Sequence, residues 1–158
     1  MSIWGLTLWA GVLGSGVMAG IYFAFSGFIM RSLAELPPAA GIAAMQSIND
    51  RILSSAFMPL FAGTSLLGLG VVIAAIVRWG SPGAVPALAA GALYVVGMFV
   101  CTAAFNVPLN NQLAAAPAAA ESAPLWDHYV QTWTVWNHVR TVASATAAGL
   151  FLVAVTQA

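Results

Sequence analysis

The chain has 158 residues, of which 61% are hydrophobic and 5% are charged, whereas about 25% of residues are charged in an average soluble protein. These few polar groups cannot cover the surface of a soluble protein of this size, and nucleic-acid binding is excluded because it needs clustered lysine and arginine side chains. The single cysteine, Cys101, excludes an internal disulfide framework and a thiolate zinc site. The composition therefore predicts an integral membrane protein.

Four stretches of the chain are apolar enough and long enough to cross a bilayer as helices, which takes about 20 residues each. They cover about residues 4–30, 53–77, 85–105 and 126–155. The first is too long for a cleaved signal peptide and lacks the basic segment that precedes one. An even number of spans predicts that both termini lie on the same side of the membrane.

The segments between these spans are short. After the Pro37-Pro38 break, residues 41–49 are expected to form a short interfacial helix between spans one and two. Residues 80–83 predict a tight hairpin, and residues 107–125 predict the longest loop, with a flexible alanine- and proline-rich part at 114–120. Neither an internal repeat nor a second domain is evident. We therefore expect one transmembrane domain over residues 1–158, an all-α four-helix bundle in up-down order.

Span one carries small residues at helical spacing. They form two series, Gly16-Gly20-Ala24 and Gly11-Ser15-Ala19. Small side chains let helix backbones approach closely in lipid, so these series predict tight packing within the bundle, with a dimerisation face as the alternative. Tyr22 and Ser26 share a further face and are expected to offer hydroxyl groups to the interior.

Span three ends with polar residues that recur every four positions, Thr102, Asn106 and Asn110. In a continuing helix these would share one face. Pro108 lies between the two asparagines and is expected to kink or end that helix. Two interpretations remain open: the amides form part of a binding site, or they cap the end of the helix.

Span four contains most of the polar groups. At about 100° per residue, seven of its residues fall within one sector of roughly 100°. They are Trp126, Tyr129, Trp133, Trp136, Asn137, Arg140 and Ser144. Residues 127, 131, 134 and 138, all polar, lie nearly opposite. A helix with polar residues on both sides is expected to be enclosed by neighbouring helices or to lie partly in the interfacial zone.

Arg140 lies about fifteen residues into this span, where a charge costs roughly 2.5–3.5 kcal/mol even on the lenient insertion scale. The expected partners are backbone carbonyls, Asn106, Asn49 or a ligand anion; the alternative is an arginine that reaches out to the interface. His138 can exchange protons near neutral pH, or it can serve only as a hydrogen-bonding group. His128 lies about 15 Å away along the helix axis, too far to share a metal ion with His138.

The motifs, taken in order, resemble the anthrone oxygenase-like family of small four-span membrane proteins. They are Ala19–Ser26, Met45–Asn49, Asn106–Asn110 and the Trp136-Asn137-His138-Val139-Arg140-Thr141 core of Trp126–Thr141. The named activity of this family is oxidation of an anthrone to an anthraquinone with O₂. The residues to which the family pattern points are Asn49, Asn106, Pro108, Asn110, Trp126, Tyr129, Trp133, Trp136, Asn137, His138 and Arg140.

The resemblance implies a cofactor-free oxygenase, since the chain lacks a carboxylate cluster, a helical Glu-x-x-His pair and a glycine-rich phosphate loop. His138 would take the benzylic proton, and Arg140 with Asn137 would stabilise the oxyanion. The remaining residues would bind the flat substrate: Asn49, Asn106, Asn110, Trp126, Tyr129, Trp133 and Trp136. No metal ligand is expected. His138 and Arg140 lie about 160° apart around the helix, so one substrate reaches both only at a kink or between helices.

Two other functions remain open. The protein could be a non-catalytic accessory subunit of a larger membrane complex, or a binder or transporter of a small lipophile or quinone. The expected partners are membrane lipids and a lipophilic aromatic molecule, together with a second copy or a larger complex. The expected location is the bacterial inner membrane. The positive-inside count, two arginines against one, leaves the orientation open.

Overall fold

The computed structural model describes residues 2–158, and every regular element in this range is a helix. Four helical stretches are long and apolar enough to cross a membrane, which confirms the predicted all-α membrane protein. They are Ile3–Ala34, Phe57–Val77, Ala84–Ala115 and Ala120–Gln157. The first span contains α1 (Ile3–Ala24) and α2 (Met30–Ala34), the second is α4 (Phe57–Val77), the third contains α5 (Ala84–Tyr94) and α6 (Val107–Ala115), and the fourth contains α7 (Ala123–Gln157).

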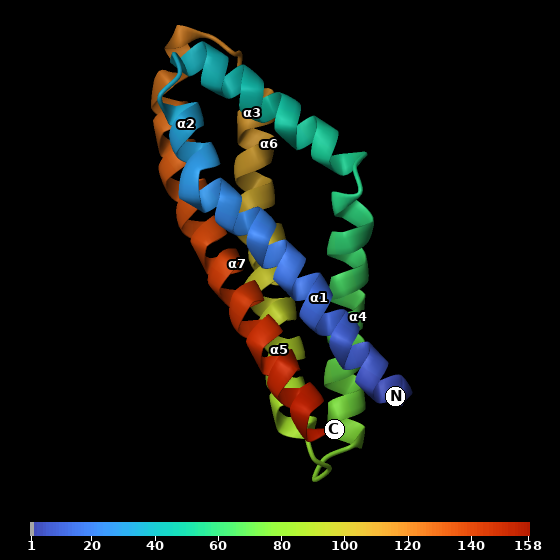
Figure 1. The fold of residues 1–158 in the computed structure, drawn as a ribbon. Helices are drawn as coiled ribbons and strands as arrows, with labels where there is room; N and C mark the ends of the chain where they lie inside the picture. Colours follow the sequence, from blue (N-terminus) through green and yellow to red (C-terminus); the bar gives the residue numbers. More distant parts are fainter. Residues whose placement is uncertain (1) are drawn as a thin grey trace.

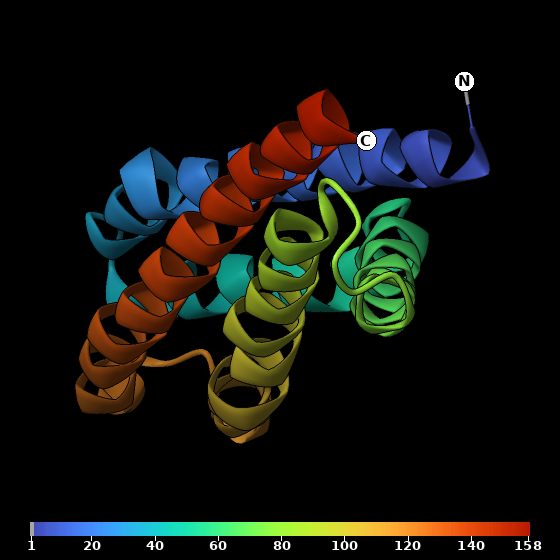
Figure 2. The same ribbon diagram turned by 90° about the horizontal axis from the view of Figure 1, so that it is seen from below.

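The four spans form an up-down bundle, and both termini lie at the same end (Figure 1). Helix α1 packs most extensively against α7, while α5 lies between α7 and α4. Figure 2 shows α7 and the α5–α6 span side by side, with α4 beyond them and α1 crossing behind. The short helix expected between spans one and two is α3 (Pro38–Leu53), which is longer than predicted and crosses the end of the bundle away from the termini (Figure 1).

Local signals explain several helix ends. The Ser2 hydroxyl oxygen accepts a hydrogen bond of 3.1 Å from the Gly5 amide and caps α1. Pro38 occupies the first turn of α3, where its missing N–H costs nothing. The predicted hairpin between spans two and three is present, and Gly83 in it has a φ of +78°. A Cβ atom at Gly83 would also lie 2.7 Å from the Ala154 carbonyl oxygen, so only glycine fits this turn.

The first and third spans contain wide turns of the π-helical type. They cover Phe25–Ile29, Val95–Val100 and Thr102–Asn106. In the last of them the Val107 amide donates to the Thr102 carbonyl, five residues back instead of four. Such turns insert an extra residue into a helix and are frequent at functional sites.

Of the two effects expected of Pro108, a kink or an end of the third span, the second is wrong, because the helix continues to Ala115. The wide turn before Pro108 accommodates its ring, and the proline then lies in the first turn of α6, where no amide is required. The predicted loop is correspondingly shorter, because residues 107–115 are helical and α7 begins at Ala123. The second span likewise begins at Phe57 and not at residue 53, since α3 runs to Leu53 and the Ser55 hydroxyl accepts from the Phe57 amide.

The two small-residue series of span one have different environments. Gly11, Ser15 and Ala19 are buried, and a Cβ atom at Gly11 would lie 3.0 Å from the Phe151 ring of α7. That series packs within the bundle, as predicted. Gly16 and Gly20 are exposed and have open space beside them, so the same prediction is wrong for the second series.

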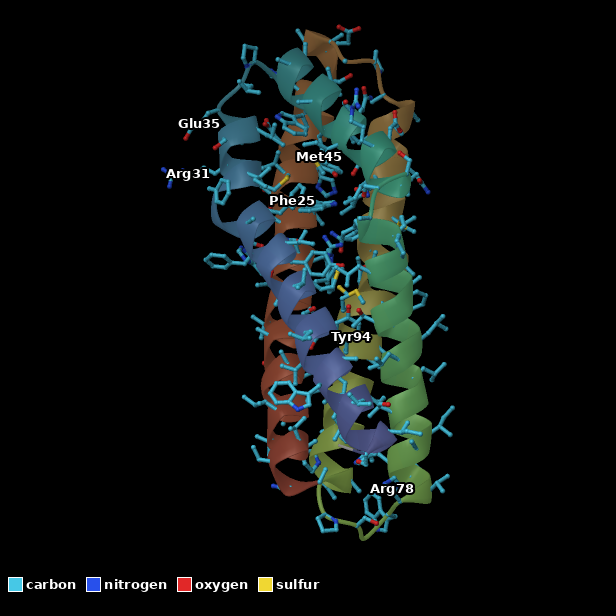
Figure 3. All side chains as sticks on the ribbon, turned by 45° about the vertical axis from the view of Figure 1, so that its right-hand side comes forward. Phe25, Arg31, Glu35, Met45, Arg78 and Tyr94 are labelled. Atoms are coloured by element: carbon cyan, nitrogen blue, oxygen red, sulfur yellow. The ribbon has the colours of Figure 1, made fainter. Side chains whose placement is uncertain are left out.

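The core divides into groups along the bundle. The group nearest α3 is rich in methionine and aromatic residues, including Met45 and Trp126, while the group at the opposite end contains mainly leucine, valine and alanine. Figure 3 shows Met45 and Tyr94 between the helices and the Arg31 and Glu35 side chains pointing away from the bundle. Arg31 and Glu35 pair at 3.6 Å on the exposed surface.

Candidate functional site: an arginine-bearing cavity

A cavity of about 310 Å³ lies between the spans in the half of the bundle nearest α3. Its volume falls within the range of small-molecule sites, about 300–1,000 Å³. Most of its lining is apolar and includes Phe25, Met45, Phe57, Phe61 and Phe99. The polar or polar-edged side chains that reach it are Tyr22, Asn49, Thr102, Asn110, Trp133 and Arg140.

Arg140 provides the positive charge in this lining. Its side chain comes from the middle of α7 and is 5% exposed. One terminal nitrogen donates to the Asn137 Oδ1 at 2.7 Å, and the other donates to the Thr102 hydroxyl at 3.4 Å. The guanidinium carbon lies 4.4 Å from the ring centroid of Tyr22 and 4.9 Å from that of Trp133. These ring faces attract a cation.

No carboxylate neutralises this charge within residues 2–158, where the ion pair of the surface residues Arg31 and Glu35 is the one salt bridge. The Arg140 Nε is also buried and has no hydrogen-bond partner in that range. A buried cation without a counter-ion is costly, and a buried donor without an acceptor adds to that cost. Arg140 is therefore arranged to receive an anion, or an oxygen on which negative charge develops.

Asn137 holds the guanidinium in position. Its Nδ2 donates to the Tyr22 carbonyl at 2.7 Å and to the Ser26 hydroxyl at 2.6 Å, while its Oδ1 accepts from Arg140. Both acceptors lie at the junction of α1 and the wide turn Phe25–Ile29. Span one and span four are thus joined through one fully buried amide, and the direction of Arg140 depends on this junction.

A second polar group surrounds Asn110 of α6. The Asn110 Oδ1 accepts from the Tyr129 hydroxyl at 2.8 Å and from the Trp133 Nε1 at 2.9 Å. Trp133 thus contacts Arg140 with its ring face and Asn110 with its nitrogen. Its ring also lies 5.6 Å from the Phe25 ring, centroid to centroid. Trp133 therefore links the two polar regions of the cavity wall.

We infer that the cavity opens to the outside of the bundle between the α3–α4 junction and the third span, because exposed residues of its lining lie there. Four of its lining residues are exposed, namely Leu53, Phe99, Ala103 and Val107. Leu53 ends α3, and the other three belong to the wide turns and the start of α6. All four side chains are apolar, so the residues around the opening form a surface that lipid tails can contact.

The structure brings four of the ten site residues predicted from the sequence to the cavity, namely Asn49, Asn110, Trp133 and Arg140. Three others lie behind the wall. Tyr129 and Asn137 hold Asn110 and Arg140 in place, while the Asn106 Nδ2 donates to the Trp133 carbonyl at 3.3 Å.

Trp126 is buried farther along α7, stacks on Tyr129 at 5.8 Å and contacts Gly41, so it does not reach the cavity. Trp136 lies outside as well. It is half-buried and stacks on the exposed Phe105 ring at 3.5 Å. Neither side chain is placed to stack on a molecule in the cavity.

His138 is separated from the cavity. It is exposed and lines a shallow hollow on the outer surface with Gly97 and Val142. Its expected role as the base for a substrate bound at Arg140 has no geometric support here. Of the two expectations for the polar sides of α7, enclosure by neighbouring helices is wrong, since residues 127, 131 and 138 are exposed. The other expectation, a position partly in the interfacial zone, stays a prediction.

Of the partners expected for Arg140, which were backbone carbonyls, Asn106, Asn49 or a ligand anion, the two asparagines do not contact it, and its side-chain partners are Asn137 and Thr102. The observed partner Thr102 was recognised in the sequence only as part of a polar series, and Tyr22 only as a hydroxyl group. In fact the Tyr22 ring faces Arg140, while its hydroxyl donates to the Met98 sulfur at 3.3 Å. Helix α4 contributes Phe57 and Phe61 to the lining. Nothing in the sequence pattern distinguishes these two residues from the other apolar residues of a span.

The described residues contain no cluster of three or more His, Cys, Asp and Glu side chains that could hold a metal ion. The fold and the cavity together define a small all-helical membrane protein with an internal cavity whose lining is mostly apolar. The sequence profile of the family described as anthrone oxygenase matches residues 51–150, and the chain belongs to that family. No curated protein and no solved structure matches it.

Proposed function

We propose that the protein is a membrane oxygenase that oxidises a flat, lipophilic aromatic molecule of the anthrone or quinol type with O₂, without a bound cofactor. The observation that carries the proposal is the buried Arg140 guanidinium, which has no carboxylate partner and faces an apolar cavity with aromatic walls. Membership of the anthrone oxygenase family supports the same class of reaction.

The charge of Arg140 matches the species that must form in such a reaction. Loss of a benzylic proton from an anthrone gives an electron-rich anion whose negative charge rests largely on the ring oxygen. A preorganised donor in a water-poor site stabilises such an oxyanion far better than water does. Trp133, Tyr22 and the phenylalanine side chains would contact the faces and edges of the rings.

The reaction then balances with O₂ as the oxidant. The anion transfers electrons to O₂, and a carbon–oxygen bond forms at the former CH₂ carbon to give a hydroperoxide after protonation. The hydroperoxide loses water as its C–H and O–O bonds break, which leaves the second carbonyl. One anthrone and one O₂ thus yield one anthraquinone and one H₂O, and one oxygen atom enters each product.

The proton would leave without a conventional base in the wall. The cavity lining contains neither a histidine nor an acidic side chain among the described residues. We infer that water or hydroxide takes the proton at the opening and that Arg140 favours the anion once it has formed. In this proposal Arg140 alone stabilises the oxyanion electrostatically, and Asn137 positions Arg140.

The test is O₂ uptake by detergent-purified protein supplied with anthrone, compared with the spontaneous rate in the same detergent. Replacing Arg140 by alanine is expected to lower kcat by about 10²–10³-fold, the usual loss when one oxyanion donor is removed. Arg31→Ala serves as the matched control, because Arg31 is exposed and pairs only with Glu35. Unchanged turnover in Arg140→Ala, or an absence of uptake above background in the wild type, would refute the proposal.

A further inference from the structure

We propose that Asn110 donates a hydrogen bond to a second oxygen of the bound molecule, so that the site binds flat aromatics with two oxygen acceptors, such as the anthraquinone product, more tightly than those with one. One oxygen is bound at Arg140 and the other at the Asn110 amide. This inference rests on the proposed function, because it concerns the same cavity, and it narrows the class of ligand.

The orientation of the Asn110 amide follows from its two neighbours. Its Oδ1 accepts from Trp133 Nε1 at 2.9 Å and from the Tyr129 hydroxyl at 2.8 Å. An indole nitrogen can only donate. A reversed amide would place its NH₂ group against that N–H and leave both without an acceptor. The oxygen must therefore face Trp133.

The Asn110 Nδ2 then points away from these partners, and it makes no hydrogen bond to any other part of residues 2–158. The residue is half-buried and lines the cavity. A donor in an apolar cavity gains by meeting an acceptor, and loses when a ligand covers it without one. The amide therefore favours an occupant that presents an oxygen at this position.

Trp133 contacts both residues that carry the two donors, Arg140 and Asn110. Its ring face lies 4.9 Å from the Arg140 guanidinium carbon, while its nitrogen contacts Asn110. The two donors therefore lie at different parts of one indole group. A flat molecule against that wall reaches both only if it carries oxygens at separate positions, as a quinone does. A ring system with a single oxygen satisfies Arg140 and leaves Asn110 unpaired.

The experiment compares anaerobic binding of anthrone, which has one oxygen, with that of anthraquinone, which has two. Quenching of tryptophan fluorescence reports the Kd values for wild-type protein and for Asn110→Leu. We expect the variant to bind anthraquinone roughly 2- to 12-fold more weakly, the range for one neutral hydrogen bond, and to bind anthrone with little change. A change in the site that weakens the binding of both ligands equally leaves the ratio of their two Kd values unchanged, so the ratio reports the Asn110 hydrogen bond alone.

Two further variants complete the comparison. Asn110→Asp keeps an acceptor for Trp133 and Tyr129 and replaces the amide donor by a carboxylate, which repels a ligand oxygen, so a shift of the Kd ratio in the same direction is expected. Asn111→Leu is the matched control, since Asn111 is the exposed neighbouring asparagine outside the cavity lining. An unchanged ratio in both Asn110 variants overturns this inference alone. If neither ligand binds the wild type, this inference and the proposed function both fail.

Discussion

The Arg140 guanidinium lies over the ring of Tyr22, with 4.4 Å between the guanidinium carbon and the ring centroid. A contact of this kind contributes about 0.5–2 kcal/mol. That is less than the several kcal/mol lost when an ion is removed from water into a protein interior. The aromatic rings thus hold the charge in place without fully compensating for its burial, and under the proposed function an anionic ligand would supply the rest.

Replacement of Arg140 by methionine is therefore expected to stabilise the empty protein while it removes turnover. Methionine fills similar space without a charge, and replacing buried ionic groups by apolar side chains often stabilises proteins by about 1–4 kcal/mol. Thermal unfolding in detergent should show a higher Tm for Arg140→Met than for wild type. A lower Tm would mean that Arg140 is held for structural reasons.

A buried acid next to Arg140 should block the site while leaving the fold intact. Thr102 lines the cavity, and its hydroxyl accepts from Arg140 at 3.4 Å. Thr102→Asp would supply the missing counter-ion, and we expect a loss of turnover similar to that in Arg140→Ala, about 10²–10³-fold. The measurement is O₂ uptake with anthrone, supported by a folding check from circular dichroism.

Thr102→Val is the matched control for the aspartate variant. Valine has the shape of threonine without the hydroxyl, so it removes one weak contact to Arg140 and adds no charge. We expect a change of about tenfold at most, because the contact is long, at 3.4 Å, and a typical hydrogen bond contributes only about 0.5–1.5 kcal/mol. Equal losses in both variants would show that the threonine hydroxyl, and not the free charge of Arg140, is what matters at this position.

Replacing His138 by alanine tests whether the reaction uses a histidine as its general base. General bases contribute about 10²–10⁴-fold to the reactions that they catalyse, but His138 lies on the outer surface beside Gly97. We therefore expect turnover in His138→Ala to stay within about twofold of the wild type, since no such contribution is lost. A drop of two orders of magnitude in O₂ uptake would instead place the reacting carbon near His138.

The sequence predicts the fold well because lipid imposes a simple rule on helix length and composition. It predicts helix ends less well near Pro108, where the effect of a proline depends on the turn before it. The wide turn Thr102–Asn106 is a tertiary feature. No single-residue preference indicates it, so the helix was expected to end ten residues too early.

For the site, helical periodicity correctly placed Trp133, Asn137 and Arg140 on one buried face of α7. It could not distinguish residues that line the cavity from those behind it, because that depends on which helices lie opposite. Trp136 illustrates the limit: it falls in the same sector, yet it packs on Phe105 at the surface. The contribution of α4 to the apolar lining, Phe57, Met58 and Phe61, has no polar residue among it to mark it in the sequence.

The contact between Gly41 and Trp126 holds α3 against α7 beside the cavity. A Cβ atom at Gly41 would lie 2.7 Å from the indole ring and 2.9 Å from the Leu33 carbonyl oxygen. Gly41→Ala is therefore expected to destabilise the protein by about 1–3 kcal/mol, the usual cost of overpacking. Gly16→Ala is the control, because a Cβ atom there meets open space. Unfolding in detergent should separate the two variants clearly.

We expect a molecule dissolved in the membrane to enter the cavity on the side where its lining residues are exposed. Ala103 lines this opening, whereas the adjacent Ala104 is exposed but lies outside the lining. Tryptophan at position 103 would fill part of a space of about 310 Å³. Since a ligand that enters there must displace the new side chain, we expect KM for anthrone to rise about tenfold or more, at a cost of about 1.4 kcal/mol per tenfold.

Ala104→Trp adds the same bulk one residue away from the opening and should leave KM unchanged. The pair of variants separates obstruction of the route from a general effect of a large side chain on the third span. Equal KM values in the two would mean that substrate enters elsewhere. If Ala103→Trp instead lowered kcat with KM unchanged, the indole would be disturbing Arg140 through the neighbouring Thr102 and not the entry of substrate.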